Sequence, residues 1–296
     1  MELYLGLTNG ILHNLLIINT KQFMKTIKSI LLGAVMLFSF NAYAQKQEII
    51  LLAHRGGCGE GMENTIGTFE KTLAAGIKAF EIDVRITKDG KIVLQHDDTL
   101  KRTAGVDKCV EDLTEKELRE ITLKDGSKLC FFDEFLKLMS KHPGLFVEIE
   151  LKCRKYTEDL LYGTGYLDKI AKAILKSTPK GSNYVMTSFD ARALRYVKEH
   201  YPSIETGYIT AKGLNHETIA IAEAIGAKRM AAHIERTSRD DMKRAHKKGI
   251  LVNLWPGGKD HSLLRAWALG ADIHCTDYPA ELLKYAEKNC PWLTIK

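Results

Sequence analysis

The sequence predicts an α/β protein folded as a TIM barrel, slightly irregular, with a small insertion around residues 98–131. Two observations predict this fold. Short β-rich runs alternate with amphipathic helical segments after residue 45, which is typical of a parallel sheet covered by helices. Polar residues suited to catalysis fall at the ends of several of these runs, and in a TIM barrel that end holds the active site. An open doubly wound sheet is the alternative, but no GxGxxG pattern follows a strand to support it.

Nine runs are candidate strands, one more than a barrel needs. The turn at residues 87–90 is too short for a parallel crossover, which needs a dozen or more residues. Residues 91–96 therefore form either an extra antiparallel strand or part of an irregular second unit. Residues 98–131 have no clear strand, hence the predicted insertion. The nine runs are Ile49–His54, Ala79–Val84, Lys91–His96, Leu145–Lys152, Tyr184–Phe189, Glu205–Ile209, Arg229–His233, Ile250–Trp255 and Asp272–Asp277.

Helices are expected between most of these strands. Asn64 or Thr65 can cap a helix that ends at Gly76. Residues 114–117 carry the Thr and Glu of a capping box. Pro279 suits the first position of a helix over residues 280–287.

The N-terminus has the three parts of a secretory signal peptide. A basic stretch follows Met24, an apolar run covers residues 30–40, and Ala-Tyr-Ala at 42–44 matches the cleavage signal before Gln45. The run is shorter than the roughly 20 residues of a membrane span, and no cysteine follows the cleavage site to carry a lipid anchor. We expect an exported, periplasmic or secreted protein, with residues 1–23 an over-extended start or a membrane-associated segment.

Composition excludes some functions. The net charge of +6 is spread along the chain, without a dense Lys/Arg block and interleaved aromatics, so nucleic acid is not an expected partner. A mild positive charge suits an anionic small molecule. The six cysteines contain no CxxC pair, so no zinc ribbon is expected. Export permits disulfides, and Cys109–Cys130 is the best single guess because both residues flank one short segment.

Paired carboxylates on two strands point to a cation. Glu81 and Asp83 are two residues apart, so both side chains leave the strand on one face. Inside a barrel, two like charges need a cation, and carboxylates suit Mg²⁺ or Ca²⁺. Glu150 would supply a third carboxylate, and Lys152 on the same face could bind a phosphate oxygen. The alternative for both strands is a solvated face.

Two histidines end apolar strands. His54 and His96 could share acid and base roles, and Arg55 could grip a phosphate. The alternative is that each histidine is structural. The glycine-rich loop 56–61 could bring backbone N–H groups near an anion or be a mobile surface loop. Trp255 could line a pocket or pack in the core.

These segments resemble the glycerophosphodiester phosphodiesterase family in order and spacing. The resemblance covers roughly residues 50–283, and its N-terminal cluster is the most specific part. The matching segments are His54-Arg55-Gly56, Glu63-Asn64-Thr65, Glu81-Ile82-Asp83-Val84, Thr87-Lys88-Asp89-Gly90, His96-Asp97, Thr99 to Thr103, Glu150-Leu151-Lys152, Ser188-Phe189-Asp190, Trp255 and Thr276 to Pro279.

The resemblance implies a single catalytic domain over residues 45–296, which follow the signal peptide that the sequence pattern predicts at 24–44. It implies metal-dependent hydrolysis of glycerophosphodiesters to an alcohol and glycerol phosphate, with one divalent cation, Ca²⁺ or Mg²⁺. The implied ligands of that cation are Glu81, Asp83 and Glu150. His54 and His96 would be the acid/base pair, and the substrate-binding residues would be Arg55, Lys152, Glu63, Phe189 and Trp255.

Some positions depart from the family pattern. Met62 replaces the usual proline, residues 56–61 are unusually rich in glycine, Pro256 follows Trp255, and Glu148 is an extra acid. These changes leave the released alcohol open. A phospholipase D-like enzyme acting on lysophospholipids is one alternative, and a non-catalytic phosphate-binding barrel is another.

Overall fold

The computed structural model describes residues 47–296, and eight parallel strands in it close into a barrel. Closure is complete because β1 pairs with β11 on one side and with β2 on the other. The fold is therefore a TIM barrel, and the open doubly wound alternative is wrong. The barrel strands are β1 (Gln47–Ala53), β2 (Ala79–Ile86), β6 (Phe146–Leu151), β7 (Asn183–Ser188), β8 (Thr206–Thr210), β9 (Arg229–His233), β10 (Leu251–Gly257) and β11 (Ile273–Thr276).

Two further strands extend this sheet. β3 (Ile92–Leu94) runs antiparallel to β2, so residues 91–96 hold the extra antiparallel strand and not an irregular barrel unit. β12 (Leu293–Ile295) lies parallel to the first half of β1, a pairing that the sequence did not predict.

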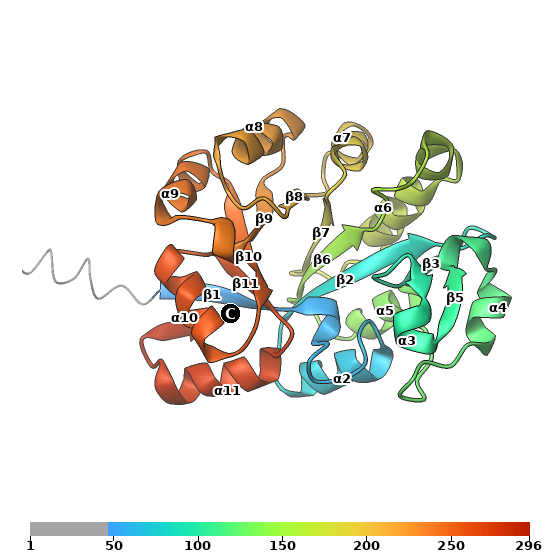
Figure 1. The fold of residues 1–296 in the computed structure, drawn as a ribbon, viewed down its shortest axis with the longest axis horizontal. Coiled ribbons are helices and arrows are strands. Elements are labelled where there is room, and N and C mark those ends of the chain that lie inside the picture. Colours follow the sequence, from blue (N-terminus) through green and yellow to red (C-terminus); the bar gives the residue numbers. More distant parts are fainter. Residues whose placement is uncertain (1–46) are drawn as a thin grey trace, which may run out of the picture. The chain divides into compact units, whose positions relative to one another are not determined.

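The insertion forms a small subdomain beside the barrel. It contains β4 (Thr99–Leu100), α3 (Lys101–Ala104), β5 (Val106–Cys109) and α4 (Glu115–Glu120), with β4 and β5 antiparallel. Its strands are too short to give a sequence pattern. Leu100, Val110, Leu118 and Phe131 are among the side chains of its own small core. Figure 1 shows α3, β5 and α4 together at one side of the molecule.

Helices surround the barrel (Figure 1). The Thr65 side chain, and not Asn64, caps the first of them by accepting from the Thr68 N–H. The capping box at Thr114 and Glu117 is present, and Pro279 is the first residue of its helix, as predicted. The helices are α2 (Ile66–Ala74), α5 (Phe132–Met139), α6 (Tyr166–Ser177), α7 (Ala191–His200), α8 (His216–Ile225), α9 (Arg239–Lys247), α10 (Asp260–Leu269) and α11 (Pro279–Asn289).

Successive side chains of each barrel strand point alternately toward the surrounding helices and into the barrel interior. On β2, Ile82 and Val84 belong to the large core that the helices cover. Ala79 belongs to a separate small cluster of strand residues inside the barrel, together with Leu52 and Ile273. Side chains two apart share a face, so the polar residues at positions 81 and 83 point inward. The predicted inward carboxylates follow directly from this alternation.

The predicted Cys109–Cys130 disulfide is wrong. All six cysteines, which lie within the described residues, are free. Cys130 is buried in the main core beside α5, whereas Cys109 is half-buried at the end of β5 in the insertion. Proximity in sequence did not reveal that Cys130 is buried in the main core while Cys109 is only half-buried in the insertion.

The predicted signal peptide and the start segment before it lie outside the described residues. Among residues 47–296, none of the helices combines the length and apolarity needed to cross a membrane.

A buried histidine makes stability depend on pH. His274 is fully buried and bonded to Ser262 Oγ (3.0 Å) and the Leu254 carbonyl (3.2 Å), and burial lowers its pKa to about 4. Between that value and the roughly 6.5 of an unfolded histidine, the unfolded chain binds a proton that the folded chain does not. We therefore predict that the free energy of unfolding falls by about 3 kcal/mol as pH falls from 6.5 to 4.

Denaturant titrations across this pH range on the native chain and on His274→Gln measure the effect. In the variant, the free energy of unfolding should lose the part of its pH dependence that comes from His274. The part that comes from carboxylates should remain in both proteins. Parallel pH profiles for the two proteins would contradict the assignment.

Candidate active site

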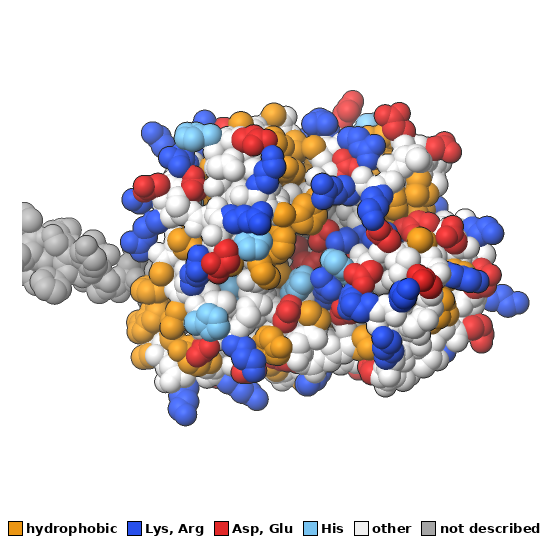
Figure 2. Space-filling view, viewed as in Figure 1, with side chains coloured by type: hydrophobic (Ala, Val, Ile, Leu, Met, Phe, Trp, Pro, Cys, Tyr) orange, Lys and Arg blue, Asp and Glu red, His pale blue; other side chains and the backbone are white. Residues whose placement is uncertain are grey.

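The polar residues singled out in the sequence converge at the C-terminal ends of the barrel strands. A cavity of about 270 Å³ opens there, lined by residues that include His54, Glu81, His96 and Glu150. Figure 2 shows a hollow near the centre of this face, with acidic and histidine side chains in it and hydrophobic side chains along one edge. The barrel therefore gathers residues from strands far apart in the chain around one pocket.

Three carboxylates form a buried cluster at the base of this pocket. Asp83 on β2 lies opposite Glu150 on the neighbouring strand β6, and Glu81 precedes Asp83 by two residues. One oxygen from each lies within 4.8 Å of the others, and none of the three side chains is more than 12% exposed. This is the trio that the sequence predicted.

The chemistry of the cluster fits a divalent cation. Glu81 Oε1 and Asp83 Oδ1 are buried without a hydrogen-bond partner, a state that is costly for carboxylates unless a cation neutralises them. Burial and the charges of Asp83 and Glu150 raise the pKa of Glu81 well above its ordinary value. Oxygen-only donors are the set that Ca²⁺ and Mg²⁺ prefer. The residues present could therefore hold either ion.

Arg55 lies beside this cluster in a constrained backbone conformation. Its φ of 51° falls in the left-handed region, which is uncommon for a residue other than glycine. In this conformation its N–H donates to Glu81 Oε2 (2.8 Å), and its side chain lies 3.2 Å from Glu63 and 3.8 Å from Asp83. The strain is consistent with a functional position.

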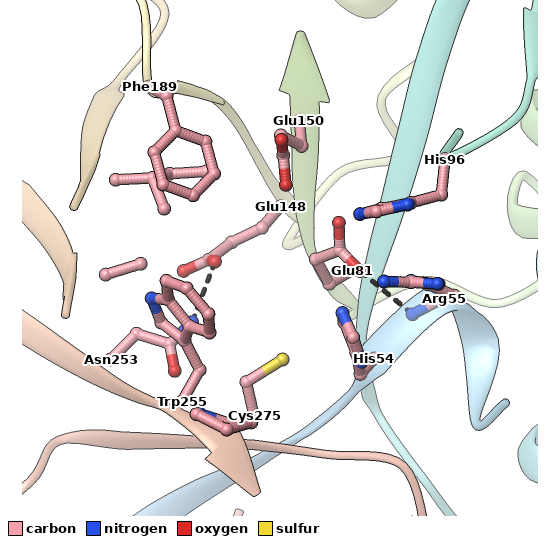
Figure 3. Close-up of a pocket in the computed structure, with 13 residues that line it drawn as sticks. His54, Arg55, Glu81, His96, Glu148, Glu150, Phe189, Asn253, Trp255 and Cys275 are labelled. Carbon is pink, nitrogen blue, oxygen red and sulfur yellow. Dashed lines mark hydrogen bonds between the residues drawn. The ribbon is translucent and has the colours of Figure 1, made fainter. Parts of the chain in front are cut away.

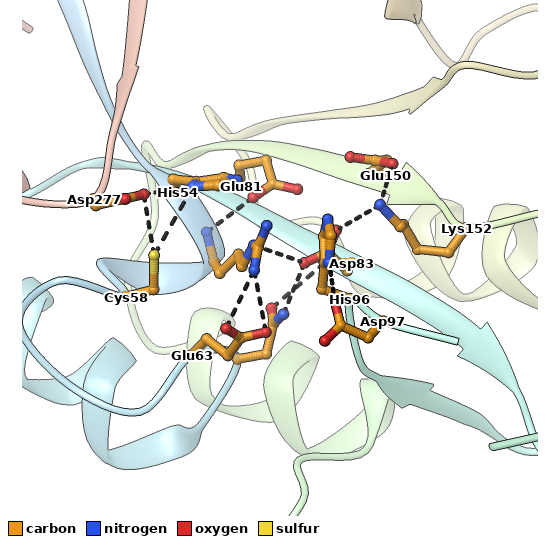
Figure 4. Close-up of polar contacts among 12 residues, drawn as sticks. His54, Cys58, Glu63, Glu81, Asp83, His96, Asp97, Glu150, Lys152 and Asp277 are labelled. Carbon is orange, nitrogen blue, oxygen red and sulfur yellow. Dashed lines mark hydrogen bonds and ion pairs between the residues drawn. The ribbon is translucent and has the colours of Figure 1, made fainter. Parts of the chain in front are cut away.

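Lys152 lies on the other side of the cluster. Its Nζ is 2.7 Å from Glu150 Oε1 and 3.5 Å from Asp83 Oδ1. Burial opposes ionisation of Asp83, but the positive charges of Lys152 and Arg55 outweigh burial and lower its pKa. Asn64 donates to the second oxygen of Asp83 at 2.8 Å. Figure 4 shows these contacts converging on Asp83.

Each of the two histidines is paired with an aspartate. His54 Nδ1 lies 2.6 Å from Asp277 Oδ1, and His96 Nδ1 lies 2.7 Å from Asp97 Oδ1. A carboxylate at Nδ1 fixes the proton there and leaves Nε2 free to exchange a proton with a substrate. Figure 3 places Glu81 between the two imidazole rings. Two oriented histidines therefore flank the carboxylate cluster.

Sequence reasoning missed the two aspartates as site residues, although both lie in segments that matched the family. Asp277 follows β11, and its distance of 223 positions from His54 concealed the pair. Asp97 is adjacent to His96, so a carboxylate immediately after a strand-ending histidine was an available signal. For Asp277 the available signal was its place directly after a barrel strand, because residues at the C-terminal ends of these strands form the active site.

The insertion contributes to the site through a second arginine. Arg102 on α3 donates to Asp97 Oδ2 (2.6 Å) and to Glu63 Oε1 (2.8 Å). Glu63 thus bridges Arg102 and Arg55 and connects the surroundings of His96 to those of the cluster. The insertion is positioned by Arg85, which donates to the His96 carbonyl and pairs with Glu111.

The opposite wall of the pocket is largely apolar. Trp255 and Phe189 meet edge to face with ring centroids 6.0 Å apart, and both line the cavity with Ile209. Below them, Asn253 donates to Glu148 across the barrel at 2.9 Å. Burial raises the pKa of Glu148 to about 7. One side of the pocket is therefore charged and the other is aromatic (Figure 3).

The predicted substrate-binding residues occupy different places. Arg55, Phe189 and Trp255 line the pocket, whereas Glu63 and Lys152 lie behind it and pair with charged residues of the site. Of the two interpretations of Trp255, its place in the pocket wall fits the structure. The glycine-rich loop folds back on the site through hydrogen bonds to the backbone of His54 and Asp277.

The chain is similar to known phosphodiesterases. Residues 54–281 match the model of the glycerophosphoryl diester phosphodiesterase family. The chain is 27% identical over 248 residues to a glycerophosphodiester phosphodiesterase of Caldanaerobacter subterraneus, covering 81% of this chain and 98% of that protein. A shorter match, 43% identical over 67 residues, links 23% of this chain to 21% of a lysophospholipase D of Homo sapiens.

Solved structures share the fold. A glycerophosphodiester phosphodiesterase of Thermotoga maritima aligns with a TM-score of 0.62 and 26% identity, over 80% of this chain and 97% of that one. A phosphodiesterase of Oleispira antarctica, solved with its product sn-glycerol-3-phosphate, aligns with a TM-score of 0.73 and 23% identity, over 81% of this chain and 97% of that one.

Proposed function

The chain belongs to the glycerophosphoryl diester phosphodiesterase family and is a phosphoric diester hydrolase, and on that premise we propose that it releases an alcohol from small glycerophosphodiesters and leaves glycerol phosphate. The observation that carries the proposal is the pair of aspartate-oriented histidines on either side of three buried carboxylates. The product seen in the Oleispira antarctica structure has the chemistry expected of such a reaction.

A divalent cation, Ca²⁺ or Mg²⁺, held by Glu81, Asp83 and Glu150 would withdraw charge from the phosphodiester oxygens. Arg55 lines the same pocket, with its side chain 3.8 Å from Asp83, and would provide a planar fork for the phosphate. Lys152 balances the negative charge of Glu150 and Asp83 from behind. These residues would hold the phosphorus between the two imidazole rings.

His54 and His96 would then divide the proton transfers. One Nε2 accepts the proton of the attacking hydroxyl, and the other donates a proton to the departing alkoxide. Asp277 and Asp97 keep the two rings turned toward the substrate. The attacking group is water or the neighbouring hydroxyl of the substrate itself, which would give a cyclic phosphate that water then opens.

Product identification tests the proposal. The purified protein is incubated with glycerophosphocholine, glycerophosphoethanolamine and glycerophosphoglycerol, with and without a chelator, and the products are separated. We expect glycerol phosphate and the free alcohol, and loss of both products in the chelated sample. A bound phosphate ester without turnover under any metal condition would instead favour a non-catalytic barrel.

The apolar wall favours a second candidate substrate class. Phe189, Trp255 and Ile209 could accommodate an acyl chain, and the short match to a lysophospholipase D points the same way. Comparing kcat/KM for glycerophosphocholine and a lysophosphatidylcholine decides between the two classes. Trp255→Ala should lower kcat/KM mainly for the preferred class, because it removes the wall that this class contacts.

Export is a further proposal, based on the signal-peptide pattern before residue 45. We predict that protein isolated from its native host begins near Gln45, because the signal elements run from Met24 to Ala44. N-terminal sequencing of the periplasmic and secreted fractions measures this. Intact protein that begins at Met1 or Met24 in the cytosolic fraction would contradict it.

A further inference from the structure

A second group of metal-binding side chains lies beside the carboxylate cluster and differs from it in chemistry. His54 Nδ1, Cys58 Sγ and Asp277 Oδ1 lie within 4.8 Å of one another. The sulfur is 3.1 Å from Asp277 Oδ1 and 3.9 Å from His54 Nδ1, and the ring nitrogen is 2.6 Å from the same oxygen. Figure 4 shows the three side chains converging.

These donors match a borderline-soft ion and not a hard one. Thiolate, imidazole and carboxylate are the ligands of Zn²⁺, whereas Ca²⁺ and Mg²⁺ take oxygen ligands. With Zn–ligand distances of about 2.0–2.3 Å, a tetrahedral ion separates its ligand atoms by about 3.3–3.6 Å. The observed separations bracket this range, so small side-chain rotations would complete the geometry. The protein would supply three ligands and leave the fourth position to water.

The loop backbone holds Cys58 in place. The Cys58 N–H donates to the His54 carbonyl (3.1 Å), and the neighbouring Gly59 N–H donates to the Asp277 carbonyl (2.8 Å). Gly57 has a φ of 106°, and a Cβ at Gly59 would lie 2.5 Å from the ring of Tyr278. The loop therefore needs glycine on both sides of the cysteine to present its sulfur to the other two groups.

We propose that His54, Cys58 and Asp277 form a Zn²⁺-type site whose occupation switches the enzyme off. The side chains of His54 and Asp277 are 28% and 41% exposed, so an ion can reach them from solvent. Binding releases the thiol proton of Cys58 to solvent and moves the imidazole proton of His54 from Nδ1 to Nε2. The covalent structure of the chain is unchanged, and the inhibition is reversible.

The inhibition follows from the proposed role of His54, on which this part of the inference rests. With an ion on Nδ1, Nε2 has no lone pair to accept a proton, and its own proton is far less acidic than that of an imidazolium. His54 could then act neither as base nor as acid. Asp277 would bind the ion in place of the Nδ1 proton, so the orienting hydrogen bond would also be lost.

Cobalt spectroscopy tests the site without relying on activity. Co²⁺ is titrated into the purified protein saturated with Mg²⁺, and the thiolate-to-cobalt charge-transfer band is recorded. We expect the band in the native chain, in the matched thiol control Cys109→Ser and in Glu81→Gln, and its loss in Cys58→Ser. Absence of the band in the native chain, or its persistence in Cys58→Ser, would overturn the site.

Inhibition assays test whether Zn²⁺ at this site stops the reaction. The rate of each variant is measured in saturating Mg²⁺ at increasing Zn²⁺ concentrations and is expressed relative to the rate of the same variant without Zn²⁺. Cys58→Ser should need at least about 10-fold more Zn²⁺ than the native chain for half-inhibition, because even indirect support of a metal costs 10–100-fold in affinity. Equal sensitivity of the two proteins, or a charge-transfer band without inhibition, would overturn the switch. If the protein hydrolyses no glycerophosphodiester, the cobalt titration still shows whether His54, Cys58 and Asp277 bind a metal ion.

Discussion

Replacing Glu81 with glutamine should lower kcat/KM by at least about 10³-fold. A bound cation contributes several kcal/mol of charge stabilisation in a transition state, and each 1.36 kcal/mol corresponds to a factor of ten in rate. The amide removes one of the three carboxylates and leaves Asp83 and Glu150 to hold the ion alone. It also accepts more weakly from the Arg55 N–H, which now donates to Glu81 Oε2.

The same variant should lose the stabilisation that the cation gives to the fold. At a cation concentration 100 times its Kd, binding stabilises the native chain by about 2.7 kcal/mol. For a domain of this size that corresponds to a rise in Tm of about 5–10 °C. Thermal unfolding with and without Ca²⁺ or Mg²⁺ measures the rise, which should be absent in Glu81→Gln.

Glu148→Gln is the matched control for cation binding. Glu148 is also a buried acid that lines the pocket, but it bonds to Asn253 and lies outside the trio of carboxylates. This variant should keep the rise in Tm. The cation hypothesis also predicts that the native chain loses activity when its divalent metal is removed. Full activity in a sample that elemental analysis shows to be free of divalent metal would refute it.

Replacing either histidine with alanine should lower the rate on a glycerophosphodiester by about 10²–10⁴-fold, the usual contribution of an acid or base. The two variants should differ on a diester with a nitrophenyl leaving group. That group departs without a proton, so the variant lacking the general acid should regain much of its rate. The variant lacking the general base should not, because the attacking hydroxyl still needs to lose its proton.

The measured quantity is the ratio of rates on the two substrates for His54→Ala and His96→Ala. The two histidines have equivalent aspartate partners, so the geometry does not show which is the general acid and which is the general base. The ratio of rates makes this assignment. Equal losses on both substrates for both variants would disprove the division of labour. Wild-type activity in either variant would make that histidine structural.

The sequence by itself determined the features that depend on local periodicity. Alternation along β2 and β6 predicted that Glu81, Asp83 and Glu150 share the barrel interior, because neighbouring residues of a strand point to opposite faces. The turn at 87–90 limited the following strand to an antiparallel pairing or an irregularity. The capping residues and Pro279 predicted the starts of α2, α4 and α11. A helix start is also a local feature, because it depends on only four or five consecutive residues.

Only the tertiary structure decided the contacts between segments distant in the chain. The His54–Asp277 pair joins the first and last barrel strands, and it exists because the sheet closes on itself. The Glu148–Asn253 bond spans the barrel. Cys130 is buried in the main core, whereas Cys109, though close in sequence, is only half-buried in the insertion. Closure and strand register set these distances, and both are properties of the assembled barrel that no local pattern encodes.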